Sequence, residues 1–135
     1  DIIDDDLLFI DADMTFELGD VRRIEEHLKN YDIVTGLYIL ANDNPAILKR
    51  MEKDYEFIQP EKELFKVDAC GAGFLGISSR IYHKLPHNPF TNIHEGELVH
   101  GEAISICHHA RQFGIEIYCD PGIKLGHIRT KVFKP

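Results

Sequence analysis

The stretch Leu7-Leu8-Phe9-Ile10-Asp11-Ala12-Asp13-Met14 places four large apolar residues before two acids that are separated by one alanine. An apolar run of this kind is typical of a buried strand whose two faces are both covered. Side chains two apart on a strand project to the same side, so Asp11 and Asp13 point the same way if the extended geometry persists through Ala12. We expect them at the carboxyl end of a strand, where open α/β sheets bind ligands.

Two carboxylates at one strand end repel each other, and a divalent cation with oxygen ligands is the natural means of offsetting that repulsion. We therefore expect Asp11 and Asp13 at a metal site. The alternative is a turn with two solvated acids, one of which caps the next helix. D-x-D is a short motif that recurs by chance, so the pair alone does not decide between these interpretations.

The length of 135 residues predicts one domain, over residues 1–135. The net charge of −8, with no run of Lys or Arg longer than two, argues against a nucleic-acid partner. No apolar run reaches the roughly 18 residues of a membrane span. Three cysteines without close spacing in the sequence do not predict a disulfide framework, so we expect a cytoplasmic protein. The sequence begins at Asp1 without Met, so we expect either a fragment of a longer protein or a chain that has been trimmed.

Strands and helices alternate along the sequence, which predicts an α/β class with a mixed sheet flanked by helices. Strands are expected at residues 7–11, 32–41, 64–68, 74–77, 115–119 and 123–126. Helices are expected at residues 16–30, 45–58, 79–85 and 101–113. Thr15 is the expected N-cap of the first helix, and Asn44 and Pro45 open the second. A loop at residues 86–96 is long enough to be functional or mobile.

Four further residues are candidates for chemistry. His127 follows an apolar strand, and histidine with carboxylates is a workable ligand set for Mn²⁺, although a partly exposed strand-end histidine looks the same in sequence. Glu102 lies in the first turn of a helix, where the macrodipole favours an ionised carboxylate that can act as a general base. An ordinary acid at a helix start is the alternative. Gly71 and Gly73 allow close backbone approach, either to a ligand or in a tight bend.

The motifs follow one another in a definite order along the sequence: an apolar strand that ends in D-x-D, and then D-I-V-x-G, G-x-G-F, P-F, G-E, C-H-H-A-R-Q-F-G-I-E-I-Y and G-H. This order resembles the GT-A fold glycosyltransferases, particularly glycosyltransferase family 2. The resemblance spans residues 7–127. Each motif is weak alone, and it is their common order that makes the resemblance specific.

The resemblance implies metal-dependent transfer of a sugar, with inversion, from a nucleotide-sugar donor to a hydroxyl of a glycan or another acceptor. It implies that Mn²⁺ or Mg²⁺ binds Asp13, that Asp11 contacts the nucleotide or metal-bound water, and that His127 completes the metal site. Gly71 and Gly73 match a segment that lines the donor-sugar and acceptor site. A carboxylate then deprotonates the acceptor while the metal stabilises the departing diphosphate.

Two departures from the family pattern bear on activity. The usual G-E-D is Gly101-Glu102-Ala103 here, so the usual catalytic Asp is absent and Glu102 is the expected substitute. The resemblance also implies a first half, before the D-x-D, that holds the nucleotide. The chain resembles only the carboxyl-terminal, metal- and acceptor-side half. We expect an exposed sheet edge through which it associates with another copy.

Two other functions are open at this point. A non-catalytic remnant or interaction module that retains the fold would explain the missing Asp at position 103. A nucleotidyltransferase or phosphoesterase would use the same acid pair, although the glycine-rich basic phosphate loop of nucleotidyltransferases is not in the sequence.

Overall fold

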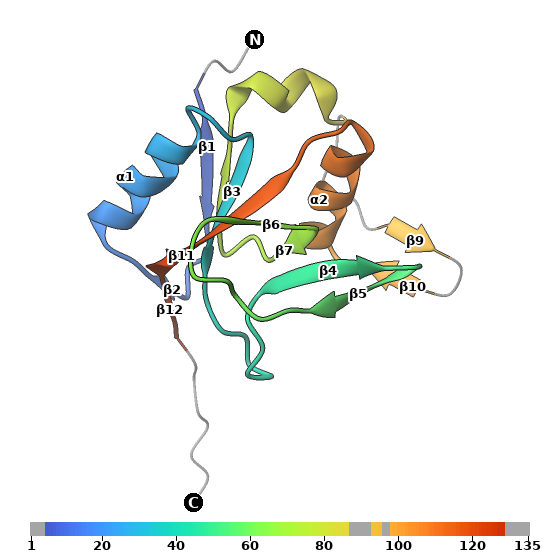
Figure 1. The fold of residues 1–135 in the computed structure, drawn as a ribbon, viewed down its shortest axis with the longest axis horizontal. Coiled ribbons are helices and arrows are strands. Elements are labelled where there is room, and N and C mark those ends of the chain that lie inside the picture. Colours follow the sequence, from blue (N-terminus) through green and yellow to red (C-terminus); the bar gives the residue numbers. More distant parts are fainter. Residues whose placement is uncertain (1–4, 87–92, 96–97, 129–135) are drawn as a thin grey trace, which may run out of the picture.

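A five-stranded mixed sheet forms the centre of the molecule (Figure 1). The computed structural model describes residues 5–86, 93–95 and 98–128. The strand order is β1 (Leu7–Ile10), β8 (Phe74–Ile77), β3 (Ile33–Leu37), β11 (Ile117–Lys124) and β6 (Phe65–Val67). The β3–β11 pair is parallel and the other three pairs are antiparallel. This arrangement confirms the predicted α/β class with a mixed sheet.

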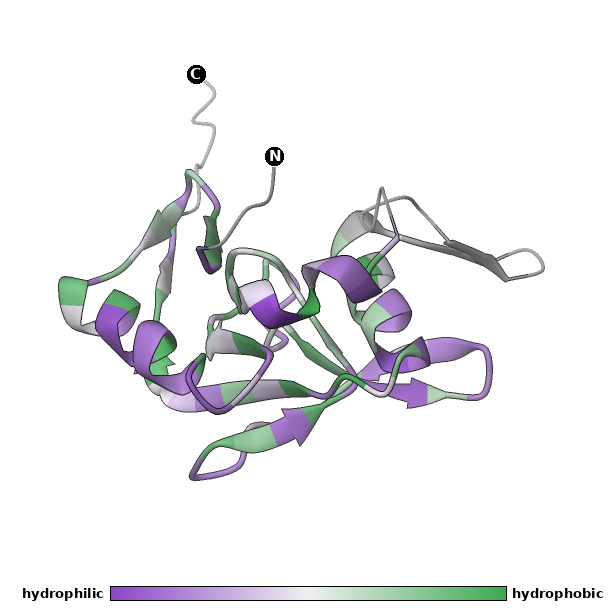
Figure 2. Ribbon diagram, turned by 90° about the horizontal axis from the view of Figure 1, so that it is seen from above, coloured by the Kyte–Doolittle hydropathy of each residue, from purple (hydrophilic) through white to green (hydrophobic). Residues whose placement is uncertain are grey.

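Helices cover both faces of this sheet. They are α1 (Leu18–His27), α2 (Glu102–Gln112) and the 3-10 helix η1 (Ser79–Lys84). Ile33 belongs to the core cluster that includes Ile106 of α2, and its neighbour Val34 belongs to the cluster that includes Ile24 of α1. Successive side chains of a strand point to opposite faces, so β3 is buried from both sides. Both hydrophilic and hydrophobic residues run along α1 (Figure 2). No helix within the described residues has the length and apolar content to cross a bilayer.

The described residues form three smaller sheets beside the central one. They are β5 (Asp54–Phe57), β4 (Ile47–Met51) and β7 (Ala69–Cys70); β2 (Met14–Thr15) with β12 (Gly126–His127); and β9 (Ile93–Glu95) with β10 (Leu98–His100). The antiparallel pair β2–β12 brings the segment after β1 against the segment after β11. This pairing positions the candidate functional site.

The helix predicted at residues 45–58 is wrong, because β4 and β5 form a hairpin there. Ile47 pairs with Cys70 of β7, so tertiary pairing overrides the helical spacing of the apolar residues. Glu52 occupies the hairpin turn with a φ of 31°, and Met51, which has helical spacing from Ile47 and Leu48, is 42% exposed. The apolar residues of this segment are spaced as in a helix, but the chain around them forms a β-hairpin.

The prediction that the first strand is buried on both faces is also wrong. β1 is an edge strand, and Leu7 and Ile10 are each 37% exposed. Asp11 donates its N–H to the Gly73 carbonyl, so the alternation of an antiparallel pair turns the backbone groups of Leu8 and Ile10 away from β8. No strand in the described part of the chain pairs with this outer edge.

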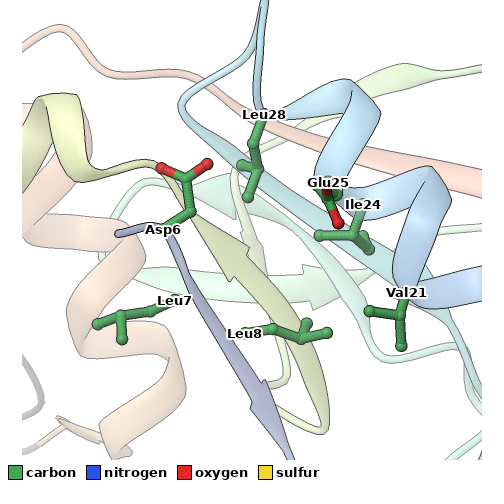
Figure 3. Close-up of a pocket in the computed structure, with 7 residues that line it drawn as sticks. All are labelled: Asp6, Leu7, Leu8, Val21, Ile24, Glu25 and Leu28. Carbon is green, nitrogen blue, oxygen red and sulfur yellow. The ribbon is translucent and has the colours of Figure 1, made fainter. Parts of the chain in front are cut away.

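A cavity of about 320 Å³ lies between β1 and α1 (Figure 3). Its lining is largely apolar and includes Leu8, Val21 and Ile24, with Asp6 and Glu25 as the acidic members. Leu7 and Leu8 of β1 line this cavity, so apolar surface lies next to the edge of the strand that no other strand of the described residues pairs with.

Smaller differences concern where elements begin and end. Glu17 is the N-cap of α1 in place of Thr15, because Thr15 is drawn into the pairing of β2 with β12. The strands predicted at residues 115–119 and 123–126 are one strand, β11, whose register with β3 shifts between Cys119 and Lys124. The strand predicted at residues 32–41 is shorter, and only an isolated Ile39–Pro45 bridge follows β3.

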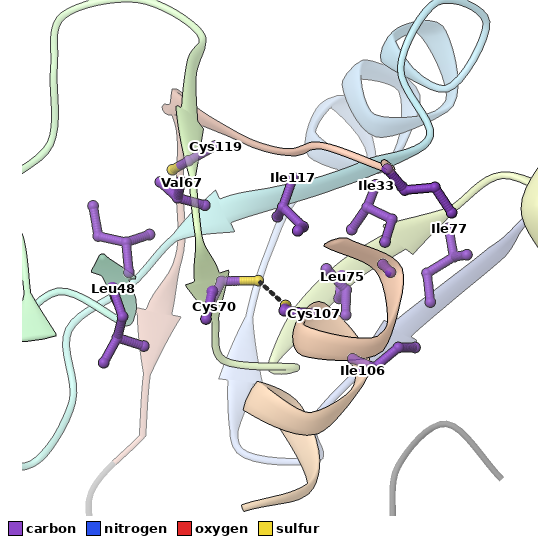
Figure 4. Close-up of a cluster of buried hydrophobic side chains, with 14 of the residues drawn as sticks. Ile33, Leu48, Val67, Cys70, Leu75, Ile77, Ile106, Cys107, Ile117 and Cys119 are labelled. Carbon is purple, nitrogen blue, oxygen red and sulfur yellow. Dashed lines mark hydrogen bonds between the residues drawn. The ribbon is translucent and has the colours of Figure 1, made fainter. Parts of the chain in front are cut away.

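Two of the three cysteines meet in the core (Figure 4). The sulfurs of Cys70 on β7 and Cys107 on α2 are 3.9 Å apart, although the residues are not close in sequence. Cys119 belongs to the same cluster, and all three are free and fully buried. The absence of close spacing in the sequence therefore did not mean absence of contact in space.

A buried carboxylate joins α1 to β11. Asp120 accepts hydrogen bonds from the Arg23 guanidinium and from His27 Nε2, each at 2.7 Å, and from the Gly122 N–H at 2.8 Å. Burial alone raises the pKa of Asp120, but the bonds from His27 and Gly122 and the charge of Arg23 outweigh burial and hold the pKa below its usual value. The ionised carboxylate is thus the form that the fold selects.

Replacing Gly76 with alanine is expected to lower the free energy of unfolding by about 1–3 kcal/mol. A Cβ at Gly76 would overlap Ile24 and approach Leu28 Cδ1 to 3.2 Å, so α1 would have to move off β8. Urea unfolding measures the change. Gly19→Ala, in α1, is the matched control, because nothing lies within 4 Å of its Cβ position. Equal stability of Gly76→Ala and the wild type would contradict the close packing of α1 on β8.

Asp120→Asn is expected to lower the free energy of unfolding at pH 7 by about 2 kcal/mol, because three donors lose an ionised acceptor. A carboxyl whose folded pKa is depressed stabilises the fold above its unfolded pKa of about 3.9, and this contribution is lost as the pH falls through the folded pKa. The free energies of unfolding of the wild type and the variant, measured with urea, should therefore become equal at strongly acidic pH. Glu116→Gln, which breaks an exposed ion pair with Lys66, should change little. A deficit that persists unchanged at low pH would contradict the assignment.

Candidate functional site

A tight turn follows β1 and carries the two acids of the D-x-D motif. The Asp11 carbonyl accepts the Met14 N–H at 3.1 Å, so the chain reverses over residues 11–14. The expectation that extended geometry persists through Ala12 is therefore wrong, and strand alternation does not relate the two acidic side chains. The reversal is favoured because it buries Met14, which is 6% exposed, and pairs it with His127 across β2–β12.

The structure brings His127 against Asp13. Nε2 of His127 lies 2.9 Å from Oδ2 of Asp13, across 114 residues of sequence. The same pairing continues in the backbone, where the Asp13 carbonyl accepts the Ile128 N–H at 2.8 Å. The imidazole is 20% exposed and the carboxylate 51%, so the pair lies at the surface with one side accessible.

The second ring nitrogen of His127 fixes how the imidazole is turned. Nδ1 lies 3.0 Å from the Ile39 carbonyl, which can only accept, so Nδ1 carries a proton and donates it. Nε2 faces Asp13: with a proton it donates to the carboxylate, and without one the nitrogen and the carboxylate oxygen present two electron-pair donors to a shared cation. A histidine whose Nδ1–H is held by a carbonyl presents Nε2 as the ligand nitrogen, which is the usual arrangement of a metal-bound imidazole.

Asp11 is exposed at the same turn, but it does not complete a three-residue ligand set. Within residues 5–86, 93–95 and 98–128, no group of three or more His, Cys, Asp or Glu side chains is arranged to hold a metal ion. Of the three predicted ligands, the structure therefore joins Asp13 and His127 and leaves Asp11 beside them. A two-residue donor set suits Mg²⁺ or Mn²⁺ when water and ligand phosphates supply the remaining oxygens.

Gly71 and Gly73 lie against a residue that the sequence reading missed, Tyr38. The Tyr38 hydroxyl accepts the Gly73 N–H at 3.0 Å, and its ring packs edge-on against the His127 imidazole, with the ring centroids 5.7 Å apart. A Cβ at Gly73 would come within 2.8 Å of the Tyr38 ring, and a Cβ at Gly71 would overlap the hydroxyl. The two glycines are thus needed for close approach to a protein side chain.

Tyr38 is buried beside both acids of the motif. Burial raises the pKa of Tyr38 to about 12, the Gly73 bond opposes this, and the charges of Cys70, Asp11 and Asp13 add to it. The hydroxyl therefore keeps its proton at neutral pH. The signal in the sequence was a tyrosine within the strand expected at residues 32–41, where the apolar residues Leu37, Ile39 and Leu40 concealed it.

The predicted base remains a prediction. α2 begins at Glu102 after the N-cap Gly101, as expected, but the Glu102 side chain lies outside the described part of the structure. Most of the loop predicted at residues 86–96 also lies outside it, at residues 87–92 and 96.

No protein-family model matches the sequence, and no curated protein matches it. Among solved structures, the chain is similar to the crystal structure of A197 from STIV, with a TM-score of 0.61. The two share a fold. The alignment covers 97% of this chain and 70% of A197 at 20% sequence identity. At that identity the similarity concerns the fold alone, so the chemistry of the site is argued from its own residues.

Tyr38→Phe is expected to lower the free energy of unfolding by about 1–3 kcal/mol, because the buried Gly73 N–H loses its acceptor while the ring stays. Thermal or urea unfolding measures the change. Tyr118→Phe is the matched control, since its hydroxyl bonds the exposed Glu116. A variant as stable as the wild type would show that the Gly73 N–H finds another acceptor.

Proposed function

We propose that this chain is the metal- and acceptor-side part of a GT-A-like glycosyltransferase, similar to family 2, that transfers a sugar from a nucleotide-sugar donor to a hydroxyl acceptor. The observation that carries the proposal is the 2.9 Å contact between His127 Nε2 and Asp13 Oδ2. The motif order along the sequence resembles that family, and the contact joins the first and last motifs in space.

The donor set fits a divalent cation. Asp13 supplies a carboxylate oxygen, and His127 supplies an imidazole nitrogen whose orientation the Ile39 carbonyl holds. Carboxylate with imidazole suits Mn²⁺, and a carboxylate with phosphate oxygens suits Mg²⁺. When bound, such an ion stabilises the charge of a departing diphosphate. Asp11, which shares the turn but not the contact, is proposed to bind the nucleotide or a metal-bound water.

The remaining roles belong to the glycine segment, to α2 and to β1. Gly71 and Gly73 are proposed to lie along the donor-sugar side of the site, with Tyr38 packed against both of them and against His127. Glu102, at the start of α2, is the proposed base for the acceptor hydroxyl. The free edge of β1 and the adjacent apolar cavity are where we propose that a nucleotide-binding half packs.

The cation site is tested by titrating the chain with Mn²⁺ and following free Mn²⁺ by electron paramagnetic resonance. Asp13→Ala and His127→Ala are each expected to weaken Mn²⁺ binding by more than about tenfold. Asp11→Ala is expected to weaken it less, because Asp11 does not contact the pair. Glu61→Ala and His83→Ala, both exposed, are the matched controls. Binding that survives both Asp13→Ala and His127→Ala would remove the metal site from the proposal.

A non-catalytic module with the same fold is the second candidate, because Ala103 occupies the position of the usual base. The glycosyltransferase and the non-catalytic module are distinguished by adding a nucleotide-binding half to the chain and assaying sugar transfer from a panel of nucleotide sugars. Transfer that Glu102→Gln abolishes supports the enzyme, and retained metal binding without any transfer supports the module. Pyrophosphate release from a nucleoside triphosphate and a sugar phosphate would indicate a nucleotidyltransferase instead.

A further inference from the structure

Tyr38 touches both sides of the candidate site. Its hydroxyl accepts the Gly73 N–H at 3.0 Å, and its ring lies at 78° to the His127 imidazole. The next residue along the chain, Ile39, provides the carbonyl that holds His127 Nδ1. Residues 38 and 39 therefore contact the glycine segment and the metal-side histidine at the same time.

The packing around Tyr38 leaves little room for independent movement. Its residue surface is 5% exposed, and it forms a small core cluster with Met14 and Ala46. The ring occupies the space that a side chain at Gly71 or Gly73 would need. Because protein interiors are close-packed, a displacement of the glycine segment toward Tyr38 has to be taken up by the ring. The same ring also contacts the His127 imidazole.

The backbone provides a second connection between the same parts. The Gly71 N–H donates to the Ala46 carbonyl at 3.0 Å, and the Ala46 N–H donates to the Tyr38 carbonyl at 3.0 Å. Hydrogen bonds thus connect Gly71 and Gly73 to Tyr38 by two routes, one through the main chain and one through the phenol.

We propose that Tyr38 is a positioning residue that couples the Gly71–Gly73 segment to the His127–Asp13 pair. The role rests on the proposed function, in which the glycine segment contacts the donor sugar and the pair holds the cation on its diphosphate. Sugar and diphosphate are covalently joined, so the two contact regions have to keep a constant spacing. Tyr38 fixes that spacing by contacting both regions, without touching the reacting atoms.

The test is a double-mutant cycle between Gly71→Ala and Tyr38→Phe in the full chain, read as Mn²⁺ affinity. In the wild-type background, Gly71→Ala is expected to weaken Mn²⁺ binding about tenfold, because the new Cβ displaces the tyrosine against His127. In the Tyr38→Phe background the same change is expected to cost less than about twofold, since the hydroxyl that the Cβ overlaps is gone. Gly101→Ala, with nothing within 4 Å of its Cβ position, is the matched control.

If Tyr38 had only a structural role, its substitution would change stability, but the effect of Gly71→Ala on Mn²⁺ affinity would not depend on whether residue 38 is Tyr or Phe. Equal effects of Gly71→Ala in the two backgrounds, or no effect in the wild-type background, would overturn the coupling.

A readout without metal separates the coupling from the proposed function. The imidazole carbon-bound protons of His127 are followed by NMR in the same four proteins. Gly71→Ala is expected to shift them in the wild-type background and to leave them nearly unchanged in Tyr38→Phe. If Asp13→Ala does not alter Mn²⁺ binding, the proposed metal site of Asp13 and His127 is wrong. The NMR measurements would still test whether Tyr38 couples the glycine segment to His127.

Tyr38→Phe by itself covers the case in which Gly71→Ala does not fold. It removes only the hydroxyl, so it is expected to shift both the Gly73 amide resonance and the His127 imidazole resonances. A shift confined to Gly73 would overturn the coupling, because the histidine would then be held independently. Tyr118→Phe, on the far end of β11 from His127, is expected to shift neither.

Discussion

The imidazole of His127 is held at both of its ring nitrogens, and its contact with Asp13 depends on this. One ring nitrogen faces the Ile39 carbonyl and the other faces the Asp13 carboxylate, so the ring cannot rotate without losing a partner. Three segments are thereby held together: the turn after β1, the chain after β3, and β12. The short β2–β12 ribbon, which has only two residue pairs, is stabilised at its end by this side-chain contact.

The elements that the sequence predicted well are those whose pattern and environment agree. α1 and α2 have apolar residues at helical spacing and bury that face, and β3 and β8 are short apolar strands that are covered on both sides. Residues 45–58 show the opposite case, because Ile47 and Leu48 pair with β7 and the helical spacing of Met51 and Tyr55 is incidental. β1 has the composition of a central strand but lies at the edge, which local sequence cannot reveal.

For the site, the sequence predicted Asp11, Asp13 and His127 near the ends of strands but could not show which acid would face the histidine. Asp13 contacts His127, whereas Asp11 stands at the start of the turn that the backbone hydrogen bond from Met14 to Asp11 closes. The sequence did not indicate Tyr38, because its contribution is to fill the space that the missing side chains of Gly71 and Gly73 leave open. A glycine that is required by a distant side chain looks the same in sequence as one that is required by a turn.

The buried cysteines have a consequence for how this molecule can be observed. Cys70, Cys107 and Cys119 lie in one cluster between the sheet and α2, and none is exposed. A water-soluble alkylating reagent therefore reaches these thiols only when the α2 side of the core opens. The rate of thiol labelling would report that opening directly, and it would do so in the unsubstituted chain.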